Sequence, residues 1–511
     1  MPVENQLIQQ AFVFALDATP RQQRAFASHA GGARFAYNWG LQRISEALDA
    51  REAEKAAGAE KPTSRVPGHF DLCKAWTQWK DTTEWTDRDT GEVTVGVPWV
   101  ARNFVGTYQA ALRDAAAAWK RFFDSRAGRL AGRRVGRPRF KKKGRSRASF
   151  QVHGAQLQVV DAHHVKLPKV GVVKTHESTR KLLRRIRKGD TTCPTCKATG
   201  QVPGKDTPKK CPACKGSGRV PVARLVRGTV SQGSDGRWSI ALTVEVVREI
   251  RTGPSDRQRA GGTIGVDLGV RSLVVTSAGE QFEHPRHLEA ALDRLAAAQR
   301  ALARCQPGSR RRAKAAARVA RLHARVANLR RDATHKLTSR LVHSHERIGV
   351  EGWDVQQTAQ HGSADVPKRV RRDRNRVLAD ANLGEIRWQL QSKAAWYGCQ
   401  VQVADRHAAT GRTCSACGQV RAKPVPPFEE QFTCPACGWC GDRRWNTARV
   451  LAAVARGEHQ QYDDAPSGGE SLNARGGDVR PGAPRRGRRS SLKREARARP
   501  PGRGETGTPG P

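Results

Sequence analysis

The sequence has 511 residues, with 92 lysines and arginines against 47 aspartates and glutamates, so its formal net charge at pH 7 is +45. An excess of this size indicates a polyanionic partner, most commonly nucleic acid. The length allows roughly two to four domains. The sequence lacks the roughly 20 consecutive apolar residues of a membrane helix, and its start lacks a secretory pattern. We therefore expect a protein of the bacterial cytoplasm that acts at the nucleoid and has no membrane partner.

The N-terminal part alternates between predicted strands and helices. Residues 9–16 are typical of a strand, and a helix is expected over 20–41. Residues 56–70 and 86–98 are polar and rich in glycine and proline, which predicts loops. Apolar residues recur at helical spacing over 98–123, which predicts a helix whose aromatic side chains belong to the core.

A basic run follows at residues 136–147. It is poor in helix-forming residues and contains one aromatic residue, Phe140. This composition suits contact with a phosphate backbone better than a solvated helix face. The predicted nucleic-acid-binding residues are Arg137, Arg139, Lys141, Lys142, Lys143 and Arg145. Alternating hydrophobicity at 156–175 and 223–247 then predicts a β-rich module.

Eight of the 12 cysteines fall in four Cys-x-x-Cys pairs. In a chain without an export signal, this pattern favours metal binding over disulfides. Two structural Zn²⁺ sites are predicted, because four thiolates complete a tetrahedral shell. The predicted ligands are Cys193, Cys196, Cys211 and Cys214 in an insert within the β-rich module, and Cys414, Cys417, Cys434 and Cys437 near the C-terminus. Cys440 is a candidate substitute ligand in the second set.

Three acidic residues follow short apolar segments or open a helix. Asp267 ends the apolar run that begins at Ile264, Glu351 ends a second run, and Asp442 follows the second cysteine set. Acids carried by separate elements to one place are what a hydrolytic Mg²⁺ or Mn²⁺ site requires. We therefore expect the side chains of Asp267 and Glu351 to lie within about a nanometre of each other.

The remaining C-terminal elements are mainly helical. Residues 286–345 predict a long basic helical hairpin broken near Pro307. A charged loop is expected over 356–375 and a helix over 379–397, followed by a strand at 400–404. The Gly/Pro/Arg-rich tail is expected to be disordered and to add non-specific affinity for nucleic acid.

Together these segments resemble TnpB, the RNA-guided nuclease of bacterial insertion sequences, and its descendants, the compact type V CRISPR effectors. The resemblance covers most of residues 10–455. Each motif alone is weak, but their order and spacing are specific. The motifs are Arg34–Trp39, Gly136–Lys143, Gly265–Gly269, His335–Ser339, Gly349–Glu351, Lys393–Gly398, Thr413–Gly418 and Asn446.

The resemblance implies an α+β multidomain protein with an RNase H-like (RuvC) mixed α/β nuclease domain, a zinc ribbon, a β-barrel wedge domain and a helical recognition domain. The implied domains are a wedge domain at 1–19 and 136–250 with a zinc-binding insert at 190–220, a recognition domain at 20–135, a nuclease domain at 260–412 with a helical insertion at 286–345, a zinc ribbon at 413–441, a last nuclease motif at 442–457 and a basic tail at 458–511.

The implied function is RNA-guided, metal-dependent hydrolysis of DNA. Guide RNA would pair with one strand of double-stranded target DNA, and the protein would read a short flanking motif. In this scheme Asp267 binds or bridges Mg²⁺ or Mn²⁺, Glu351 holds the ion that activates water, and Asp442 completes the shell.

One departure from the family pattern concerns the third acid. The family places an aspartate two residues before the asparagine, whereas Arg444 precedes Asn446 here. A guanidinium beside Mg²⁺ inverts a charge and weakens the hold on one ion. Three interpretations follow: Asp442 supplies the carboxylate, Arg444 contacts the scissile phosphate, or the site is impaired and the protein is a guided silencer. A strand-transferase or transposase-like accessory role in transposition and DNA recombination is a further alternative.

Overall fold

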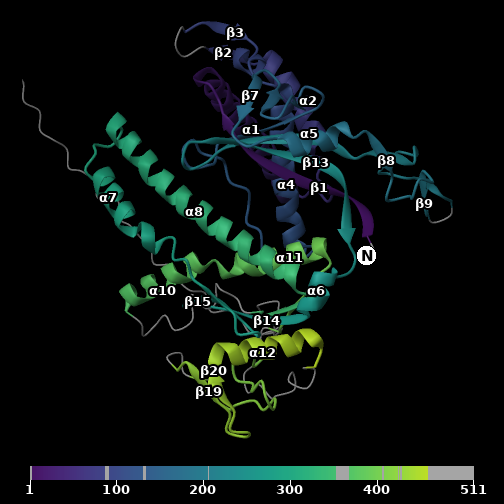
Figure 1. Ribbon diagram of the computed structural model, residues 1–511. Helices are drawn as coiled ribbons and strands as arrows, with labels where there is room; N and C mark the ends of the chain where they lie inside the picture. The colour runs from purple at the N-terminus through teal and green to yellow at the C-terminus, as the bar shows by residue number, and fades with distance from the viewer. Residues whose placement is uncertain are drawn as a thin grey trace, which may run out of the picture. The chain divides into compact units, whose positions relative to one another are not determined.

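The computed structural model describes residues 3–86, 91–130, 134–204, 207–352, 367–405, 408–423, 425 and 429–458. These residues form a mixed α/β structure (Figure 1). No described helix combines the length and the apolar character needed to cross a membrane. The predicted disordered tail lies outside the described residues from 459 onward, as does most of the predicted loop at 356–375.

The largest sheet is antiparallel and has seven strands in the order β4-β12-β13-β1-β7-β6-β5. Its strands are β1 (Val3–Asp17), β4 (Ser149–His153), β5 (Gln158–Val159), β6 (His164–Leu167), β7 (Gly171–Thr175), β12 (Ala223–Gln232) and β13 (Trp238–Arg251). β1 pairs with β13 from Val3↔Arg251 to Ala15↔Ser239 and then with β7 from Leu16↔Thr175. The strands predicted within residues 9–16, 156–175 and 223–247 are confirmed.

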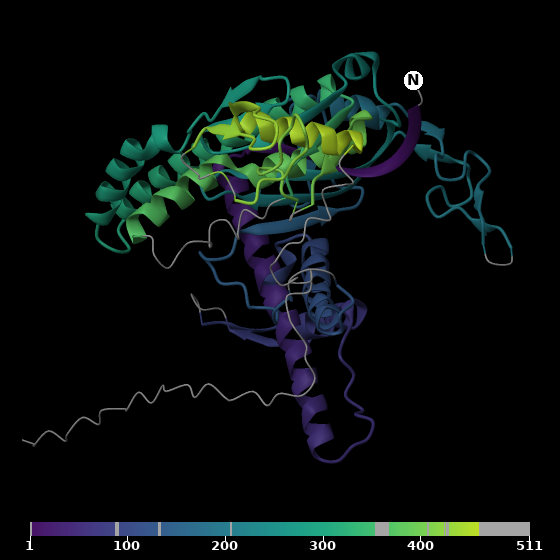
Figure 2. The same ribbon diagram turned by 90° about the horizontal axis from the view of Figure 1, so that it is seen from below.

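The predicted helix that follows β1 is longer than expected. α1 (Pro20–Ala56) is one continuous helix of 37 residues (Figure 2). It begins at a capping box, in which the Thr19 side chain accepts from the Gln22 backbone N–H and Gln22 bonds back to the Thr19 backbone. Its buried face packs on α4 (Val105–Arg126), with Phe26, Ile44, Tyr108 and Leu112 almost fully buried.

The predicted loops around α1 are partly wrong. Four further elements occupy this region: α2 (His69–Thr82), the paired strands β2 (Glu84–Thr86) and β3 (Val93–Val95), and α3 (Pro98–Ala101). The hairpin replaces part of the loop expected over 86–98. Trp85 and Trp99 belong to an aromatic network here, and this packing stabilises short strands whose local sequence is polar.

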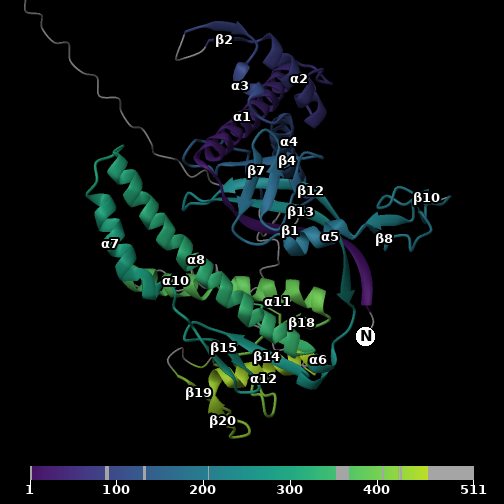
Figure 3. The ribbon, with the colours of Figure 1, turned by 45° about the horizontal axis from the view of Figure 1, so that its top comes forward.

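The cysteine-rich insert contains small paired strands rather than strands of the main sheet (Figure 3). α5 (Arg180–Arg187) precedes it. β8 (Asp190–Thr192) pairs with β11 (Arg219–Pro221), and β9 (Gln201–Val202) pairs with β10 (Lys209–Lys210). The four cysteines and Val220 form the buried centre of this unit.

A second sheet carries the predicted acids, with the strand order β16-β15-β14-β17-β18. Its strands are β14 (Thr263–Leu268), β15 (Ser272–Thr276), β16 (Gln281–Glu283), β17 (Arg347–Val350) and β18 (Gln400–Val403). β14, β15 and β16 are antiparallel neighbours, whereas β14, β17 and β18 run parallel. The carboxyl ends of the three parallel strands therefore meet at one edge.

Helices cover both faces of this sheet; α11 and α12 lie on opposite sides of it (Figure 1). The helices of this part are α6 (Asp256–Gly261), the 3₁₀ turn η1 (Glu289–Ala291), α7 (Leu292–Ala303), α8 (Arg310–Ser344), α10 (Lys368–Ala381), α11 (Leu383–Tyr397) and α12 (Arg443–Arg456). α7 and α8 pack together as the predicted helical hairpin. The helix predicted over 379–397 is divided at Asn382, which has a φ of 55°.

α12 lies directly on the backbone of the sheet because two glycines leave room for it. A Cβ at Gly265 would lie 1.8 Å from the carbonyl oxygen of Ala448, and one at Gly349 would lie 2.0 Å from that of Leu451. The two glycines are register partners on β14 and β17. This close approach places the first turn of α12 beside the strand ends that carry the acids.

Candidate nuclease site and metal centres

The structure brings Asp267 and Glu351 together at the carboxyl edge of adjacent parallel strands. Asp267 lies in β14 and Glu351 directly follows β17, one position beyond the register pair Val266↔Val350. Neighbouring strands are separated by about 5 Å, and the Asp267 charge acts on Glu351, so the two acids lie within electrostatic range of each other. Asp267 is 7% exposed. Glu351 is partly exposed, so the arrangement pairs a buried carboxylate with a half-buried one.

Arg444, from the first turn of α12, reaches this pair. Its Nε donates a hydrogen bond to Asp267 Oδ2 at 2.5 Å. Its terminal nitrogens donate to the backbone oxygens of Ser272, at 2.7 Å, and of Asp267, at 3.2 Å. A Cβ at Gly269 would lie 2.5 Å from the guanidinium, so the glycine after the acid leaves the space that the arginine fills. Arg444, at the position where the family carries its third acid, therefore forms an ion pair with Asp267.

The two carboxylates disfavour each other's ionised form. Burial raises the pKa of Glu351 to about 7, and the Asp267 charge adds to the rise, whereas a hydrogen bond from Thr410 opposes it. The Thr410 hydroxyl donates to Glu351 Oε1 at 2.9 Å. Burial also raises the pKa of Asp267, and the Arg444 guanidinium opposes this shift. A divalent cation between the two acids would relieve the repulsion, so this oxygen donor set fits one such ion.

Asp442 occupies a different position from the buried pair. It is exposed and serves as the N-cap of α12, where its Oδ1 accepts from the Trp445 backbone N–H at 2.7 Å. Asp267, Glu351 and Asp442 do not form a three-ligand group among the described residues, because one oxygen atom from each does not lie within 4.8 Å of both others. Its charge still raises the pKa of Asp267, so it lies within electrostatic range. Its role as third metal ligand remains a prediction.

Substitution of Glu351 by glutamine tests the burial of its charge. In the native state Glu351 keeps its proton up to about pH 7, whereas an unfolded glutamate ionises near its ordinary pKa of 4.5. Native stability is therefore lost as the pH rises between these values. We expect Glu351→Gln to raise the free energy of unfolding near pH 8 by at most about 3 kcal/mol, at 1.36 kcal/mol per pKa unit, and the gain to vanish near pH 4.5.

Urea unfolding of the wild type and of Glu351→Gln without added Mg²⁺, from about pH 4.5 to pH 8, measures this difference in the free energy of unfolding. Glu289→Gln serves as the control, because the Glu289 side chain is 60% exposed and belongs to a surface ion pair. A stability gain for Glu351→Gln that does not change with pH would show that its charge carries no burial penalty.

Both predicted cysteine sets are gathered in space. Each set places one sulfur atom per residue within 4.8 Å of the other three. The pairs Cys193–Cys211 and Cys196–Cys214 lie 3.9 and 3.6 Å apart. In the second set, Cys414–Cys437 and Cys417–Cys434 lie 3.8 and 3.6 Å apart. A tetrahedral Zn²⁺ with Zn–S bonds of about 2.3 Å requires sulfurs about 3.8 Å apart, so both sets fit a structural zinc ion. Cys440 is exposed and lies outside the second set.

The second cysteine set is physically tied to α12. Asn446 Oδ1 accepts from the Ser415 backbone N–H at 2.8 Å, and Asn446 Nδ2 donates to the Thr413 carbonyl at 2.7 Å. Asn446 is fully buried. Two residues earlier on the same helix, Arg444 contacts Asp267. The metal cluster therefore helps to fix the helix that positions the arginine.

The basic run is irregular in structure, as expected, but its members differ in exposure. Lys142, Lys143 and Arg145 are exposed. Lys141 is half-buried: its Nζ lies 3.9 Å from the centre of the Tyr37 ring, and burial lowers its pKa. Its backbone N–H donates to Asn38 Oδ1, and its carbonyl accepts from Asn38 Nδ2. Arg137 and Arg139 are exposed, with Arg137 5.4 Å from the Trp119 ring.

Three family sequence models match the chain. One described as a probable transposase (OrfB, IS605) matches residues 241–361, and a Cas12f1-like TNB domain matches 384–451. A helix-turn-helix domain of the same OrfB group matches 5–53, although here that range comprises β1 and most of the single helix α1. These matches and the relatives below show that the chain belongs to the OrfB/IS605 family.

A relative from Mycobacterium tuberculosis strain CDC 1551, named "Putative RNA-guided DNA endonuclease", is 32% identical over 483 residues, which span 90% of this chain and 92% of the relative. Escherichia coli K12 InsQ, which has the same description, is 26% identical over 87% of this chain and 92% of its own length. Among solved structures, a Cas12f1–guide RNA–target DNA complex has 12% identity and a TM-score of 0.27, covering 87% of this chain and 99% of that chain. CasPhi-2 (Cas12j) bound to crRNA has 11% identity and a TM-score of 0.33, covering 89% of this chain and 99% of that chain.

Proposed function

We propose that this protein is an RNA-guided DNA endonuclease that hydrolyses target DNA at the strand edge formed by Asp267 and Glu351. The observation that carries the proposal is the pair of carboxylates at the ends of adjacent parallel strands, one buried and one half-buried, in a chain of this family. The net charge of +45 supports a nucleic-acid substrate.

The proposed domain assignment follows the sequence expectation. The second sheet and its helices would form the RNase H-like domain at 260–412, with the hairpin at 286–345 as its insertion, and 442–457 would supply its last motif. Residues 413–441 would form the zinc ribbon. The seven-stranded sheet would be the wedge domain, and α1 to α4 the recognition domain that holds guide RNA and target DNA. Support for this comes from the strand order and from the two cysteine clusters.

Asp267 and Glu351 would hold the divalent cation, Mg²⁺ or Mn²⁺. A bound ion of this kind lowers the pKa of water and stabilises charge on the phosphate oxygens. Thr410 orients the Glu351 carboxylate through its hydroxyl. Arg444 opposes the rise in the Asp267 pKa that burial causes, and it supplies a fixed positive charge at the place where a second cation would bind. The two carboxylates and the guanidinium therefore fit one divalent ion better than two.

The guide RNA would supply sequence specificity by pairing with the target strand. Lys142, Lys143 and Arg145 are exposed in the basic run and are the proposed phosphate contacts of the heteroduplex. Lys141 instead serves to anchor this run to α1 through Asn38 and Tyr37.

The test uses the protein purified with its own guide RNA and a plasmid library that carries the matching target beside randomised flanks. We expect Mg²⁺-dependent cleavage of matched plasmids, no cleavage of plasmids with a scrambled target, and loss of cleavage in Asp267→Asn. Asparagine keeps the size and one oxygen of the side chain but removes the charge that binds metal. Cleavage that persists in Asp267→Asn would place the chemistry elsewhere.

A second candidate function is guided DNA binding without cutting, and one observation favours it. The ion pair between Arg444 and Asp267 engages an oxygen that a nuclease of this design needs for metal. In the same experiment, this silencer would retain matched plasmids intact, with an affinity that Asp267→Asn leaves unchanged. Intact, tightly bound plasmid would therefore decide for the silencer.

A further inference from the structure

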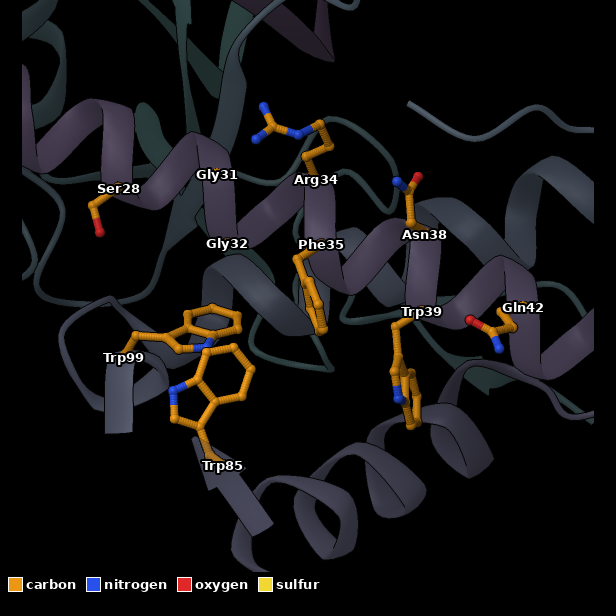
Figure 4. A pocket seen from close by; sticks show the side chains of 10 residues that line it. All are labelled: Ser28, Gly31, Gly32, Arg34, Phe35, Asn38, Trp39, Gln42, Trp85 and Trp99. Carbon is orange, nitrogen blue, oxygen red and sulfur yellow. The ribbon is translucent and has the colours of Figure 1, made fainter. Parts of the chain in front are cut away.

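An open pocket lies on one face of α1, distant in the sequence from the nuclease residues (Figure 4). Its volume is about 550 Å³, within the range of small-molecule sites. Ten residues line it: Ser28, Gly31, Gly32, Arg34, Phe35, Asn38, Trp39, Gln42, Trp85 and Trp99. The nuclease chemistry proposed above uses none of them.

Aromatic rings form one wall of the pocket. In Figure 4, Phe35 and Trp39 point to the side of α1 on which Trp85 and Trp99 lie. The ring centres of Phe35 and Trp99 are 5.2 Å apart and meet edge to face, and those of Trp85 and Trp99 are 6.3 Å apart. Trp39 is buried, but Phe35 is 38% exposed, and Trp85 and Trp99 are partly exposed. The inner rings are thus core, whereas the outer rings present an accessible apolar face.

The opposite rim is polar and cationic. Arg34 and Asn38 point away from the aromatic wall (Figure 4). Both polar atoms of the Asn38 side chain are bonded to the backbone of Lys141, at 2.8 and 3.0 Å. Asn38 therefore holds the basic run next to the pocket, with the exposed Lys142 one residue away. A ligand here would place a flat ring against the aromatic wall and negative charge near the cationic rim.

Gly31 supplies a separate indication that the pocket accepts a ligand. A glycine inside a helix costs up to about 1 kcal/mol relative to alanine. The neighbouring Gly32 has a packing reason, because a Cβ there would lie 2.8 Å from the Tyr108 ring. A Cβ at Gly31 would meet only the end of the Arg34 side chain, at 4.0 Å. Among the described residues, no close neighbour excludes a side chain at position 31, and the glycine leaves this part of the pocket floor open to a ligand.

We propose that this pocket binds one unstacked nucleobase of a nucleic-acid strand. The base stacks against the rings of Phe35, Trp85 and Trp99, and its flanking phosphates lie toward Arg34 and the basic run. Stacking on aromatic side chains is a common way for proteins to hold single strands, and it tolerates any base. The inference rests on the proposed nucleic-acid function, but it does not require that the protein cleaves DNA. The base can come from the guide RNA or from the DNA.

The first test measures how much a base adds to binding. The full-length protein is titrated, at one moderate salt concentration, with a fluorescent oligothymidylate of about ten nucleotides and with an abasic strand of equal charge. We expect the base-bearing strand to bind about five- to 150-fold more tightly, which is the range for one stacked base. Trp99→Leu should abolish most of this preference, whereas Trp388→Leu, at a more exposed tryptophan outside the pocket (60% exposed), should keep it.

The second test uses Gly31→Ala, because the proposal predicts opposite effects on stability and binding. The alanine should raise the melting temperature of the free protein, since it favours the helix and meets no close neighbour. The same variant should lose most of the base preference, because its methyl group occupies the pocket floor. A purely structural glycine would give either destabilisation or no change in base preference.

An oligouridylate and its abasic RNA counterpart distinguish the source of the base. A preference seen only with RNA assigns the pocket to the guide, and one seen only with DNA assigns it to a target strand; both support the pocket. Equal affinity of base-bearing and abasic strands in both series overturns the proposal. Because these ratios are measured without guide or target, they are independent of whether guided cleavage is observed.

Discussion

Arg444→Leu is expected to lower the free energy of unfolding by about 3–5 kcal/mol in the absence of divalent cations, because it leaves the Asp267 carboxylate buried without a partner. The side chains of the pair are only 20% and 10% exposed. Two backbone carbonyls also lose their hydrogen bonds from the guanidinium. Chemical unfolding followed by circular dichroism measures the loss, and added Mg²⁺ should restore part of it by binding in place of the guanidinium.

Arg456→Leu is the matched control, because Arg456 lies on the same helix but pairs with Glu458 at the surface with 42% of its side chain exposed. We expect this control to lose less than about 1 kcal/mol. An equal loss in the two variants would refute the view that Arg444 neutralises a buried charge.

Arg444→Asp extends the test to metal binding. A carboxylate at this position faces Asp267 and Glu351, so the free protein should be less stable than wild type. Mg²⁺ should then raise the melting temperature more in this variant than in wild type, because a third acid completes a divalent-ion site. A smaller Mg²⁺ response in Arg444→Asp would show that position 444 does not face the ion.

The second large effect is expected from loss of the C-terminal zinc cluster. Structural zinc contributes about 10–16 kcal/mol to the folding of small zinc domains. Cys414→Ser with Cys417→Ser should remove one of about two Zn²⁺ ions per chain and reduce guided cleavage about 100-fold or more, since the loss of the Asn446 contacts shifts α12 and Arg444 relative to Asp267. Metal analysis and plasmid cleavage measure the two effects.

The insert provides an internal comparison. Cys193→Ser with Cys196→Ser should also remove one Zn²⁺ ion, but these residues pack in a small separate cluster with Val220 rather than with α12. We therefore expect much less loss of cleavage from this variant. An equal loss from both double variants would argue against a specific link between the ribbon and the nuclease edge.

Short-range patterns in the sequence predicted the metal-cluster geometry well. Each Cys-x-x-Cys pair is local, so its two sulfurs are held together by one turn, and only the meeting of two such turns depends on the fold. The positions of the acids at the strand ends could likewise be predicted, because Asp267 and Glu351 each end an apolar strand segment and parallel strands align their ends. The helix start expected at residue 20 agrees with the start of α1 at Pro20.

Contacts between residues far apart in the sequence could not be predicted from the local sequence pattern. The sequence shows an arginine in the place of an acid, but not that its guanidinium contacts Asp267, 177 residues away, over the space left by Gly269. The local sequence around Asn38 also gives no sign of its hydrogen bond to the backbone of Lys141, which lies 103 residues away. The β2–β3 hairpin depends on a tryptophan network drawn from several elements, so its polar local sequence predicted a loop instead.

The separation of Asp267 and Arg444 along the chain also affects when activity can arise during synthesis. At translation rates of roughly 5–20 residues per second, α12 is made on the order of ten seconds or more after β14. Until then, the flat surface around Gly265 and Gly349 has no helix on it, and the ribbon that steadies that helix is unfinished. We expect chains whose synthesis stops before α12 to be unable to cut DNA, so that cleavage can begin only after this helix has been made.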